Sequence, residues 1–513
     1  MIEPDLLPPP AGVLPLVSGP GVARHGRWLL LVAAGLLLVS FYHRVLHIDE
    51  AWIGEQAYWA AKEGAVRSEL FRGLLGAETR QLVYHWLFVW QGAAVIKLAG
   101  WSVGGLRLIG LAYLGVFLLL SHRHLRRHYF ESQAGLRLFY ILLLSNALLA
   151  EYAYMFRPEV MLMTLGFGSW LALERSYFGR GKLAEPGPAA GQVRYAALAG
   201  LLAGAAALTH LNGLVFIGAG AGLLLRRHRH RVGPLLAFGL AAAAVFSIYW
   251  LDLWRLDAWE AYLRQLAPAG PQPAPEGANR LWTYAGHVLS EHRRFFHSPV
   301  EAALTLLTGA AALVLHRAAP ASRRRADLLL YLLLLVAAVA ALTPGKTTKY
   351  MLLYLPYPCL LIALAFEARL TRPRRLAALL PALLAGYLLI NFGYTGYLIS
   401  RHDDQPARSR ALARRLAPAR PERLLAPPEF IFPEIENYTI QSVTCYAMLQ
   451  KAGRLPSGEA AFFAAAARFR RQLIILDDNS LKVLGLRPPV AGRTYGRYRY
   501  QYQFQRYYVY EAL

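Results

Sequence analysis

The hydrophobic residues of this chain gather into long runs that are separated by short polar connections. Each run approaches the roughly 20 apolar residues that a helix needs to cross about 30 Å of hydrocarbon. The pattern predicts an all-α polytopic membrane protein with about 11 transmembrane helices. The predicted spans are residues 28–47, 104–120, 138–154, 159–174, 195–209, 211–225, 233–251, 299–315, 327–342, 350–367 and 376–397.

Basic residues occupy every second connection between the predicted spans. Arginines cluster, for example, at 123–127, 226–231 and 323–325. Basic residues beside membrane helices are retained in the cytoplasm, so these connections and the N-terminus are predicted to be cytoplasmic. An odd number of spans then places the C-terminal part outside. The Pro-rich residues 1–27 are predicted to form a disordered cytoplasmic tail.

The connection at about 48–103 is predicted to be a large first extracytoplasmic loop. It contains an apolar run at 82–100 that also carries His85, Gln91 and Lys97. Counting this run as a span would invert every later connection against the charge pattern. We therefore predict a helix that lies on the outer face of the membrane or re-enters it.

The chain after residue 400 has a different pattern of apolar and polar residues, which predicts shorter helices and strands. One stretch alternates aromatic and polar residues, which is typical of a half-buried strand. The strand candidates are 423–425, 473–476 and 498–504, and the helical stretches are 408–416 and 459–471. We predict a small extracytoplasmic α/β domain at 400–513, which follows a transmembrane domain at 28–399.

Composition narrows the class of protein further. Of the 513 residues, 56% are hydrophobic and 17% are charged, whereas soluble domains carry about 25% charged residues. Two cysteines exclude a disulfide framework and a cysteine-based zinc site. The net charge of +24 is divided among separate short loops. Because a nucleic-acid footprint is one contiguous basic face, we predict no nucleic-acid partner.

Two adjacent carboxylates, Asp49 and Glu50, follow the first predicted span. In one interpretation Asp49 caps a helix at about 50–63 that ends at Gly64, and Glu50 favours the positive end of that helix. In the other, one carboxylate takes a proton from a hydroxyl at the membrane surface, and its neighbour orients that hydroxyl or binds a metal. The two roles are compatible.

The other predicted outer connections are short and carry cations. Arg157 and Glu159 flank a proline at the start of a span, where the acid suits the helix dipole and the arginine suits a phosphate. His210 lies in a tight turn and could be only a turn residue. Lys346, Lys349 and Tyr350 precede a late span, where the lysines either snorkel or cradle a lipid phosphate.

A phosphate-binding P-loop around Lys346 is excluded, because Ala340 stands where the motif needs glycine. Acidic and cationic candidates thus collect on one predicted face, whereas the other face carries basic loops. This asymmetry points to chemistry at the outer interface that involves an anionic, lipid-like group.

The chain resembles the GT-C membrane glycosyltransferases over roughly residues 28–400. The similarity is to the branch of the protein O-mannosyltransferases and the lipid A aminoarabinose transferases. It rests on the Asp-Glu pair after the first span, the long first outer loop, the Arg-Pro-acid motif and the lysine-rich stretch 346–356. Some relatives carry aspartate at the position of Glu159, and the first loop contains no DxD pair of the oligosaccharyltransferase type.

The resemblance implies that a sugar passes, with inversion, from a polyprenyl phosphate to an acceptor hydroxyl. Asp49 would be the general base, and Glu50 would position the acceptor or a metal. The substrate-binding candidates are Arg157, Glu159, His210, Lys346, Lys349 and Tyr350. The acceptor is a glycan, a lipid or a protein, and the expected location is the plasma (inner) membrane. The cofactor is left open, a divalent metal being one alternative.

Two other functions are compatible with this sequence. A transporter or flippase for a lipid-linked glycan should place ionisable groups near the middle of the membrane, whereas the predicted span centres here are rich in Leu and Ala. A non-catalytic scaffold of the cell envelope predicts that Asp49→Asn is harmless.

Overall fold

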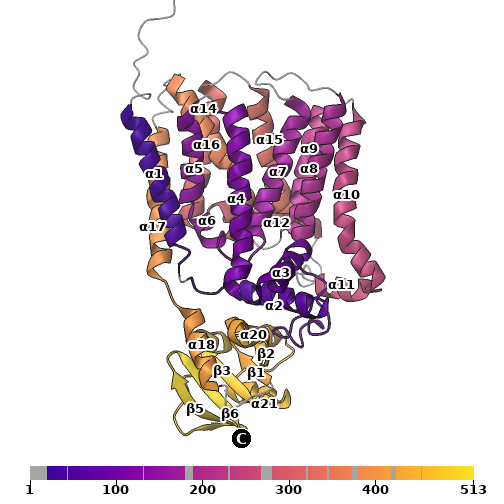
Figure 1. Ribbon diagram of the computed structural model, residues 1–513, viewed down its shortest axis with the longest axis vertical. Helices are drawn as coiled ribbons and strands as arrows, with labels where there is room; N and C mark the ends of the chain where they lie inside the picture. Colours follow the sequence, from indigo (N-terminus) through magenta and orange to yellow (C-terminus); the bar gives the residue numbers. More distant parts are fainter. Residues whose placement is uncertain are drawn as a thin grey trace, which may run out of the picture.

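The protein is a bundle of long helices with a small sheet domain packed against one end (Figure 1). A computed structural model describes residues 20–42, 44–130, 132–178, 189–228, 231–266, 280–318, 322–343, 346–371, 379–416, 423–451 and 453–513. The bundle helices are α1 (Pro20–Val39), α4 (Val103–His128), α5 (Gln133–Ser145), α7 (Glu159–Phe178), α8 (Ala189–Thr209), α9 (Leu214–Arg227), α10 (Val232–Arg255), α14 (Pro299–Ala318), α15 (Arg323–Leu342), α16 (Pro356–Thr371) and α17 (Leu379–Ser400). We name the end beside the sheet domain the domain end and the opposite one the far end.

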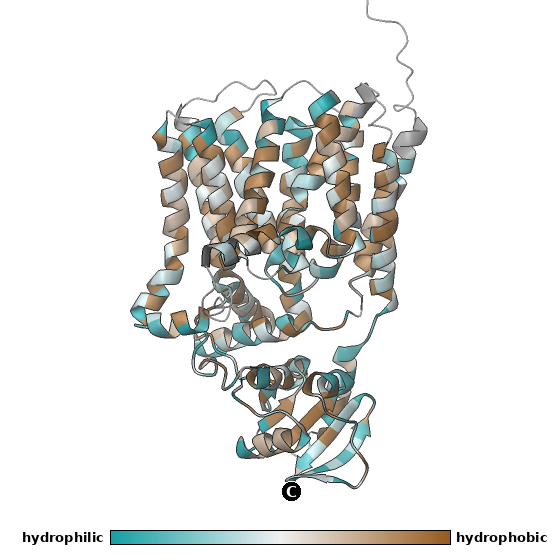
Figure 2. Cartoon of the chain, turned by 180° about the vertical axis from the view of Figure 1, so that it is seen from behind, coloured by the Kyte–Doolittle hydropathy of each residue, from teal (hydrophilic) through white to brown (hydrophobic). Residues whose placement is uncertain are grey.

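The outside of the bundle is apolar (Figure 2). Leu108, Leu240 and Leu389 are 62%, 69% and 74% exposed, respectively. Such a surface fits a lipid environment. In the described part of the chain, five segments are long and apolar enough to cross a membrane, and shorter apolar helices accompany them. The five are Val103–His128, Val232–Arg255, Pro299–Arg317, Arg323–Leu342 and Leu379–Leu416. The total of about 11 spans stays a prediction.

The first helix begins and ends earlier than the sequence predicts. Because α1 starts at Pro20, residues 20–27 are helical rather than part of a disordered tail. The Arg44 side chain donates to the carbonyl of Ser40 at 2.7 Å and to that of Ala150 at 2.6 Å, which satisfies backbone oxygens where the chain leaves the helix. Residues 1–19 of the predicted tail lie outside the described residues.

The predicted span 138–154 is divided into α5 and α6 (Ala147–Tyr152). Asn146 lies between them with extended backbone, and its side-chain oxygen caps α6 by accepting from the amide of Leu148 at 3.1 Å. Its side-chain nitrogen donates to the Tyr387 hydroxyl of α17 at 3.0 Å. These local hydrogen bonds replace those that a continuous helix would make.

The predicted span 350–367 is also divided, into the 3-10 helix η3 (Thr348–Leu353) and α16. The helix α16 starts at Pro356, where the missing N–H of proline costs nothing because the first amides of a helix have no intrahelical partner. Lys349 and Tyr350 therefore lie on η3, at the domain end of the bundle.

The first loop forms two helices at the domain end, α2 (Ile48–Glu63) and α3 (Trp86–Ala99). They pack against each other, and α3 also contacts α4 and α8. The glycine at the end of α2, Gly64, has a φ of 69°, so it stops the helix in the left-handed region as the sequence predicts.

Three short helices follow α10. They are α11 (Trp259–Leu266), α12 (Arg280–Leu289) and α13 (His292–Phe295). The turn between α8 and α9 is formed by η1 (Leu211–Gly213), with His210 directly before it.

The C-terminal part folds into the predicted mixture of strands and helices. A six-stranded sheet has the order β2-β1-β3-β6-β5-β4, in which β1 runs parallel to β2 and β3 and the other pairs are antiparallel. The strands are β1 (Arg423–Ala426), β2 (Thr439–Ser442), β3 (Leu473–Asp477), β4 (Thr494–Tyr495), β5 (Tyr498–Phe504) and β6 (Tyr507–Ala512). The helices are α18 (Gln405–Leu416), α19 (Ile431–Glu434), α20 (Val443–Lys451), α21 (Glu459–Arg468) and α22 (Asp478–Leu484), with η6 (Pro428–Phe430) before α19.

One hydrophobic core joins the sheet domain to α2 and α3. It contains buried residues of the first loop, such as Ala57 and Phe88, together with Leu424 and Phe430 of the sheet domain. The indole of Trp101 stacks on Phe432 with ring centroids 5.1 Å apart. Because the two parts share a core, the sheet domain and the first loop hold each other in place.

Candidate functional site

The helix α2 begins beside the site and is capped by His47. The amide of Asp49 donates to Nδ1 of His47 at 3.0 Å, and the amide of His47 donates to Oε2 of Glu50 at 3.0 Å. This reciprocal pair is a capping box in which histidine takes the usual place of serine or threonine. The interpretation that Asp49 caps the helix is therefore wrong, and the Asp49 carboxylate is available for other contacts.

Glu50 points into the protein rather than toward solvent. Its side chain is 0% exposed and accepts two hydrogen bonds from Arg107 of α4, at 2.7 and 2.8 Å. With the His47 amide, the amide of Phe156 at 3.0 Å brings the total to four. Glu50 thus ties the start of α2 to α4 and to the segment before α7, so its surroundings differ from those of a group that meets substrate.

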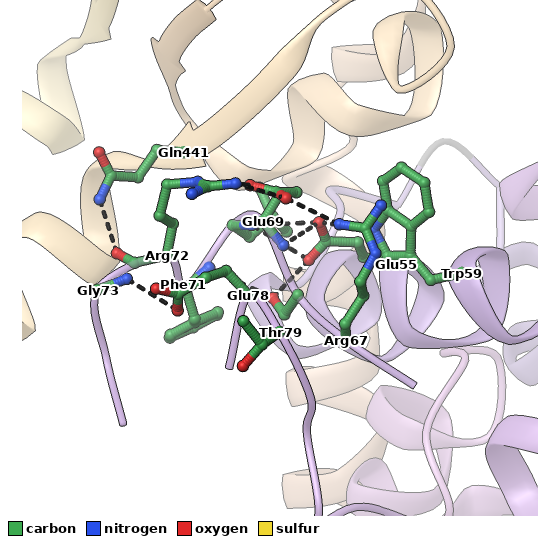
Figure 3. Close-up of polar contacts among 12 residues, drawn as sticks. Glu55, Trp59, Arg67, Glu69, Phe71, Arg72, Gly73, Glu78, Thr79 and Gln441 are labelled. Carbon is green, nitrogen blue, oxygen red and sulfur yellow. Dashed lines mark hydrogen bonds and ion pairs between the residues drawn. The ribbon is translucent and has the colours of Figure 1, made fainter. Parts of the chain in front are cut away.

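A second buried carboxylate, Glu55, anchors the middle of α2 (Figure 3). It accepts hydrogen bonds from the Ser68 hydroxyl at 2.5 Å and from the amides of Glu69 and Leu70 at 2.7 and 3.1 Å. The indole of Trp59 donates to it at 3.2 Å. These donors fold the chain after α2 into a fixed turn.

That turn is also hydrogen-bonded to the sheet domain. The amide of Ser442 donates to the Leu70 carbonyl at 2.9 Å, and the Gln441 side chain donates to the Arg72 carbonyl at 2.9 Å (Figure 3). Glu50 and Glu55 therefore connect α2 to the bundle on one side and to the sheet domain on the other, which makes α2 a rigid support for Asp49.

Asp49 lies among cations at the domain end. Its carboxylate is hydrogen-bonded to Arg157, and Nζ of Lys349 lies 3.7 Å from Oδ2. The side chains of Asp49 and Lys349 are 28% and 23% exposed, so both can be reached from outside. The structure thus brings together residues from α2, the start of α7 and η3 that the sequence had separated by more than 100 positions.

Arg157 is fixed by Glu159 and aimed at Asp49. Glu159 accepts from Nε of Arg157 at 3.1 Å and from Nη2 at 2.7 Å, and both side chains are nearly inaccessible. The remaining guanidinium nitrogen donates to Asp49 and lies 3.2 Å from Nδ1 of His47. A bidentate pair of this kind removes the rotational freedom of the guanidinium.

Aromatic rings form the wall next to these charges. His210 stacks on His85 with ring centroids 4.5 Å apart, and Tyr350 meets His210 edge-on at 6.0 Å. Burial lowers the pKa of His85 to about 4 and holds the pKa of His210 well below its usual value. Both rings are therefore neutral at pH 7, which is compatible with stacking beside Arg157 and Lys349.

Lys346 lies in a separate cluster. Its Nζ contacts Oε2 of Glu291 at 2.7 Å, and Arg294 donates to Oε1 of the same carboxylate at 2.7 Å. Arg294 also lies over the Tyr350 ring, with 5.4 Å between Cζ and the ring centroid. The sequence makes both lysines candidates for cradling a lipid phosphate. In the structure Lys349 lies beside Asp49, whereas Lys346 is paired with Glu291.

Several residues around Asp49 were not chosen as candidates from the sequence. His85 was visible as a polar residue in an apolar run, and Arg107 as a charge near the start of a membrane helix, which is costly unless paired. His47 adjoins Asp49 in the chain. Arg294 carried no signal, since it stands in a long connection with other basic residues.

The described side chains around Asp49 offer few ligands for a metal ion. Within the described residues, no group of three or more His, Cys, Asp or Glu side chains is arranged to hold a metal ion. Around Asp49 the neighbouring groups are mainly nitrogen donors of Arg157 and Lys349, which repel a cation.

Two buried carboxyls where the sheet domain meets the first loop predict a pH effect on stability. Burial raises the pKa of Glu55 to about 7, and burial beside Asp477 raises that of Glu429 to about 7. The folded protein then holds these protons at pH values where the unfolded chain has lost them. Their contribution to stability is complete below about pH 4.5 and declines as the pH rises toward 7.

We therefore expect Glu429→Gln to gain thermal stability relative to the wild type as the pH rises from about 5 to about 8. Glu436→Gln is the control, because Glu436 is 60% exposed. The measurement is the difference in melting temperature between variant and wild type at each pH. Parallel pH profiles for wild type and Glu429→Gln would contradict the assignment.

A helical bundle carries two helices of the first loop at one end, and a sheet domain packs upon them. The solved structures similar to this chain have that fold. ArnT from Cupriavidus metallidurans bound to undecaprenyl phosphate has a TM-score of 0.58 and 13% identity, over 95% of this chain and 98% of that chain. Its apo form has a TM-score of 0.54 and 14% identity, over 96% and 98%.

A third similar structure is larger than this chain. The arabinofuranosyltransferase AftD from Mycobacteria has a TM-score of 0.51 and 15% identity, covering 95% of this chain but 40% of AftD. No protein-family model and no curated protein sequence matches the chain. At these identities the similarity establishes the fold alone.

Proposed function

We propose that this protein is a membrane glycosyltransferase that moves a sugar from a polyprenyl-phosphate donor to an acceptor hydroxyl at the domain end. The observation that carries the proposal is the accessible Asp49 carboxylate on a rigid helix, directly beside Arg157 and Lys349. A base next to fixed cations suits a reaction that takes a proton from a hydroxyl and releases a phosphate. The fold shared with ArnT, whose structure holds undecaprenyl phosphate, supports the choice of donor.

The proposed reaction is a single displacement with inversion. The acceptor oxygen attacks the anomeric carbon and forms the new glycosidic bond as the bond to the phosphate oxygen breaks. The electron pair of that bond leaves with the polyprenyl phosphate, and the acceptor proton passes to Asp49. Because a phosphate is a good leaving group, a strong general acid is not required.

Arg157 and Lys349 have different roles in this proposal. Arg157 is held by Glu159, so it fixes the orientation of the Asp49 carboxylate. Lys349 is the cation offered to the phosphate, because its Nζ is partly exposed and lies 3.7 Å from Asp49 without the fixed bidentate geometry of Arg157. His210 and Tyr350 shape the wall beside the reacting sugar. Glu50 positions α2 through Arg107.

The test is transfer of radiolabelled sugar from a pool of polyprenyl-phosphate sugars in membranes that contain the purified protein. We expect a labelled acceptor to form with the wild type. Movement of the labelled lipid across the bilayer without a new glycosidic bond would instead favour a transporter. If the protein changes neither the labelling of the acceptor nor the movement of the lipid, a non-catalytic scaffold is favoured.

Replacement of Lys349 by methionine is expected to lower the transfer rate about 10- to 100-fold, because one charge-assisted contact to the phosphate is worth about 2 kcal/mol. Lys349→Arg should retain more activity than Lys349→Met. Lys62→Met, at a lysine that is 54% exposed on α2, is the matched control. Initial rates at saturating donor decide the point, and equal rates for the two methionine variants would remove Lys349 from the mechanism.

A further inference from the structure

The far end of the bundle contains a pocket of about 470 Å³ that the proposed reaction does not use. It is lined by Tyr177 of α7, Arg226 and Arg227 of α9, and Arg323 and Asp327 of α15. We name it the arginine pocket. It lies opposite the domain end, because α4 and α9 end there and α15 begins there (Figure 1).

The floor of the arginine pocket is a buried ion pair. The side chains of Arg227 and Asp327 are 2% and 4% exposed, and Nε of Arg227 donates to Oδ2 of Asp327 at 3.0 Å. A second nitrogen of Arg227 donates to the Leu173 carbonyl at 2.9 Å. The pair fixes the guanidinium and connects α7, α9 and α15.

The remaining cations of the pocket contact an aromatic ring. Tyr177 lies between two guanidinium groups, with Cζ of Arg227 at 5.2 Å and Cζ of Arg323 at 5.3 Å from the ring centroid. Arg226 and Arg323 are exposed at the rim, whereas Tyr177 is 7% exposed. A neutral ring orders these arginines without cancelling their charge.

The charge balance calls for an anion. Among the residues that the structure describes, three arginines line the pocket and Asp327 is its one carboxylate, so this lining carries two positive charges in excess. An anion that lies between the guanidinium groups and contacts two of them reduces the repulsion between their charges. Phosphate oxygens match the planar fork of arginine in geometry as well as in charge.

We propose that the arginine pocket binds the phosphate of an anionic lipid headgroup. The pocket lies where α9 ends and where α15, which is long and apolar enough to cross a membrane, begins; this is the level at which lipid phosphates lie. Basic pockets between membrane helices are suited to such headgroups. A bound lipid would hold α9 and α15 together through the rim arginines, apart from the chemistry at the domain end.

The test compares lipid binding by the full chain and by the double variant Arg226→Gln/Arg323→Gln, which leaves the buried Arg227–Asp327 pair intact. The probes are phosphatidylglycerol and phosphatidylcholine in nanodiscs, and binding is read by native mass spectrometry and by the melting temperature. We expect a selective phosphatidylglycerol affinity in the wild type that falls roughly 25-fold in the variant, about fivefold for each arginine.

Arg126→Gln/Arg127→Gln is the matched control, because it removes two exposed arginines from the same end of the bundle, on α4. Equal losses in both double variants would overturn the proposal, since they would reflect general surface charge. If the double glutamine variant folds poorly, Arg226→Lys/Arg323→Lys takes its place as the test and should retain most of the binding. Titration of the detergent-solubilised protein with inorganic phosphate separates the sources of the anion: stabilisation that needs the rim arginines would assign the pocket to free phosphate and overturn the lipid assignment.

Discussion

The variant Asp49→Asn is expected to transfer sugar about 10²- to 10⁴-fold more slowly than the wild type, which is the range for loss of a general base. Asparagine keeps the size of the side chain and can still accept a hydrogen bond from Arg157. It cannot take the acceptor proton. The helix should remain intact, because His47 rather than Asp49 caps α2.

The measurement is the initial rate of transfer at equal amounts of folded protein, checked by melting temperature. Glu260→Gln is a suitable control, since that carboxylate is 88% exposed and makes only a 3.9 Å ion pair with Arg264. A wild-type rate in Asp49→Asn would exclude Asp49 as the base. A slow variant that also melts early would point to a structural role for Asp49 within the cationic cluster.

The variant Glu50→Gln should be destabilised by about 3–5 kcal/mol, because it leaves Arg107 buried without its counter-ion. Arg107 is 5% exposed and has both of its hydrogen-bonded nitrogens on Glu50. Its guanidinium also lies over the Tyr154 ring, 4.1 Å from Cζ to the centroid, and a ring cannot replace the carboxylate charge. Thermal unfolding in detergent measures the loss.

A double-variant cycle separates this effect from simple loss of a side chain. Replacing both partners, as Glu50→Leu/Arg107→Met, should recover much of the stability, although the amides of His47 and Phe156 each lose their acceptor at a cost of about 1–3 kcal/mol. Glu436→Gln removes an exposed pair with Lys62 and should cost less than about 1 kcal/mol. If Glu50→Gln unfolds no earlier than Glu436→Gln, the ion pair is not structural.

The helices of the bundle could largely be predicted because their apolar runs are long and their ends carry charge. The sequence could not show that Asn146 divides one run, since its partner Tyr387 lies 241 residues away. The early end of α1 depends on the contact of Arg44 with Ala150, 106 residues further on. Local periodicity carries no information about such distant hydrogen bonds.

The site shows the same limit at the level of single residues. Asp49, Arg157 and Lys349 were candidates because they are polar groups at the ends of apolar runs, and the structure brings them together. Glu50 was grouped with Asp49 because the two are adjacent in the sequence. Successive positions on a helix point about 100° apart, so Asp49 lies among the cations whereas Glu50 is buried against Arg107. Lys346 was grouped with Lys349, whereas in the structure it forms an ion pair with Glu291 in a separate cluster.

The shared core between α2 and the sheet domain has a consequence for how the protein is made. Leu46, directly before the site, donates to Gln405, which is 359 residues later in the chain. A ribosome therefore completes the helix that carries Asp49 early, but the surface that supports this helix is synthesised much later. Until the sheet domain has been translated and folded beside it, the nascent chain lacks the support for the helix that carries Asp49, so we expect an unfinished protein to lack any activity that depends on Asp49.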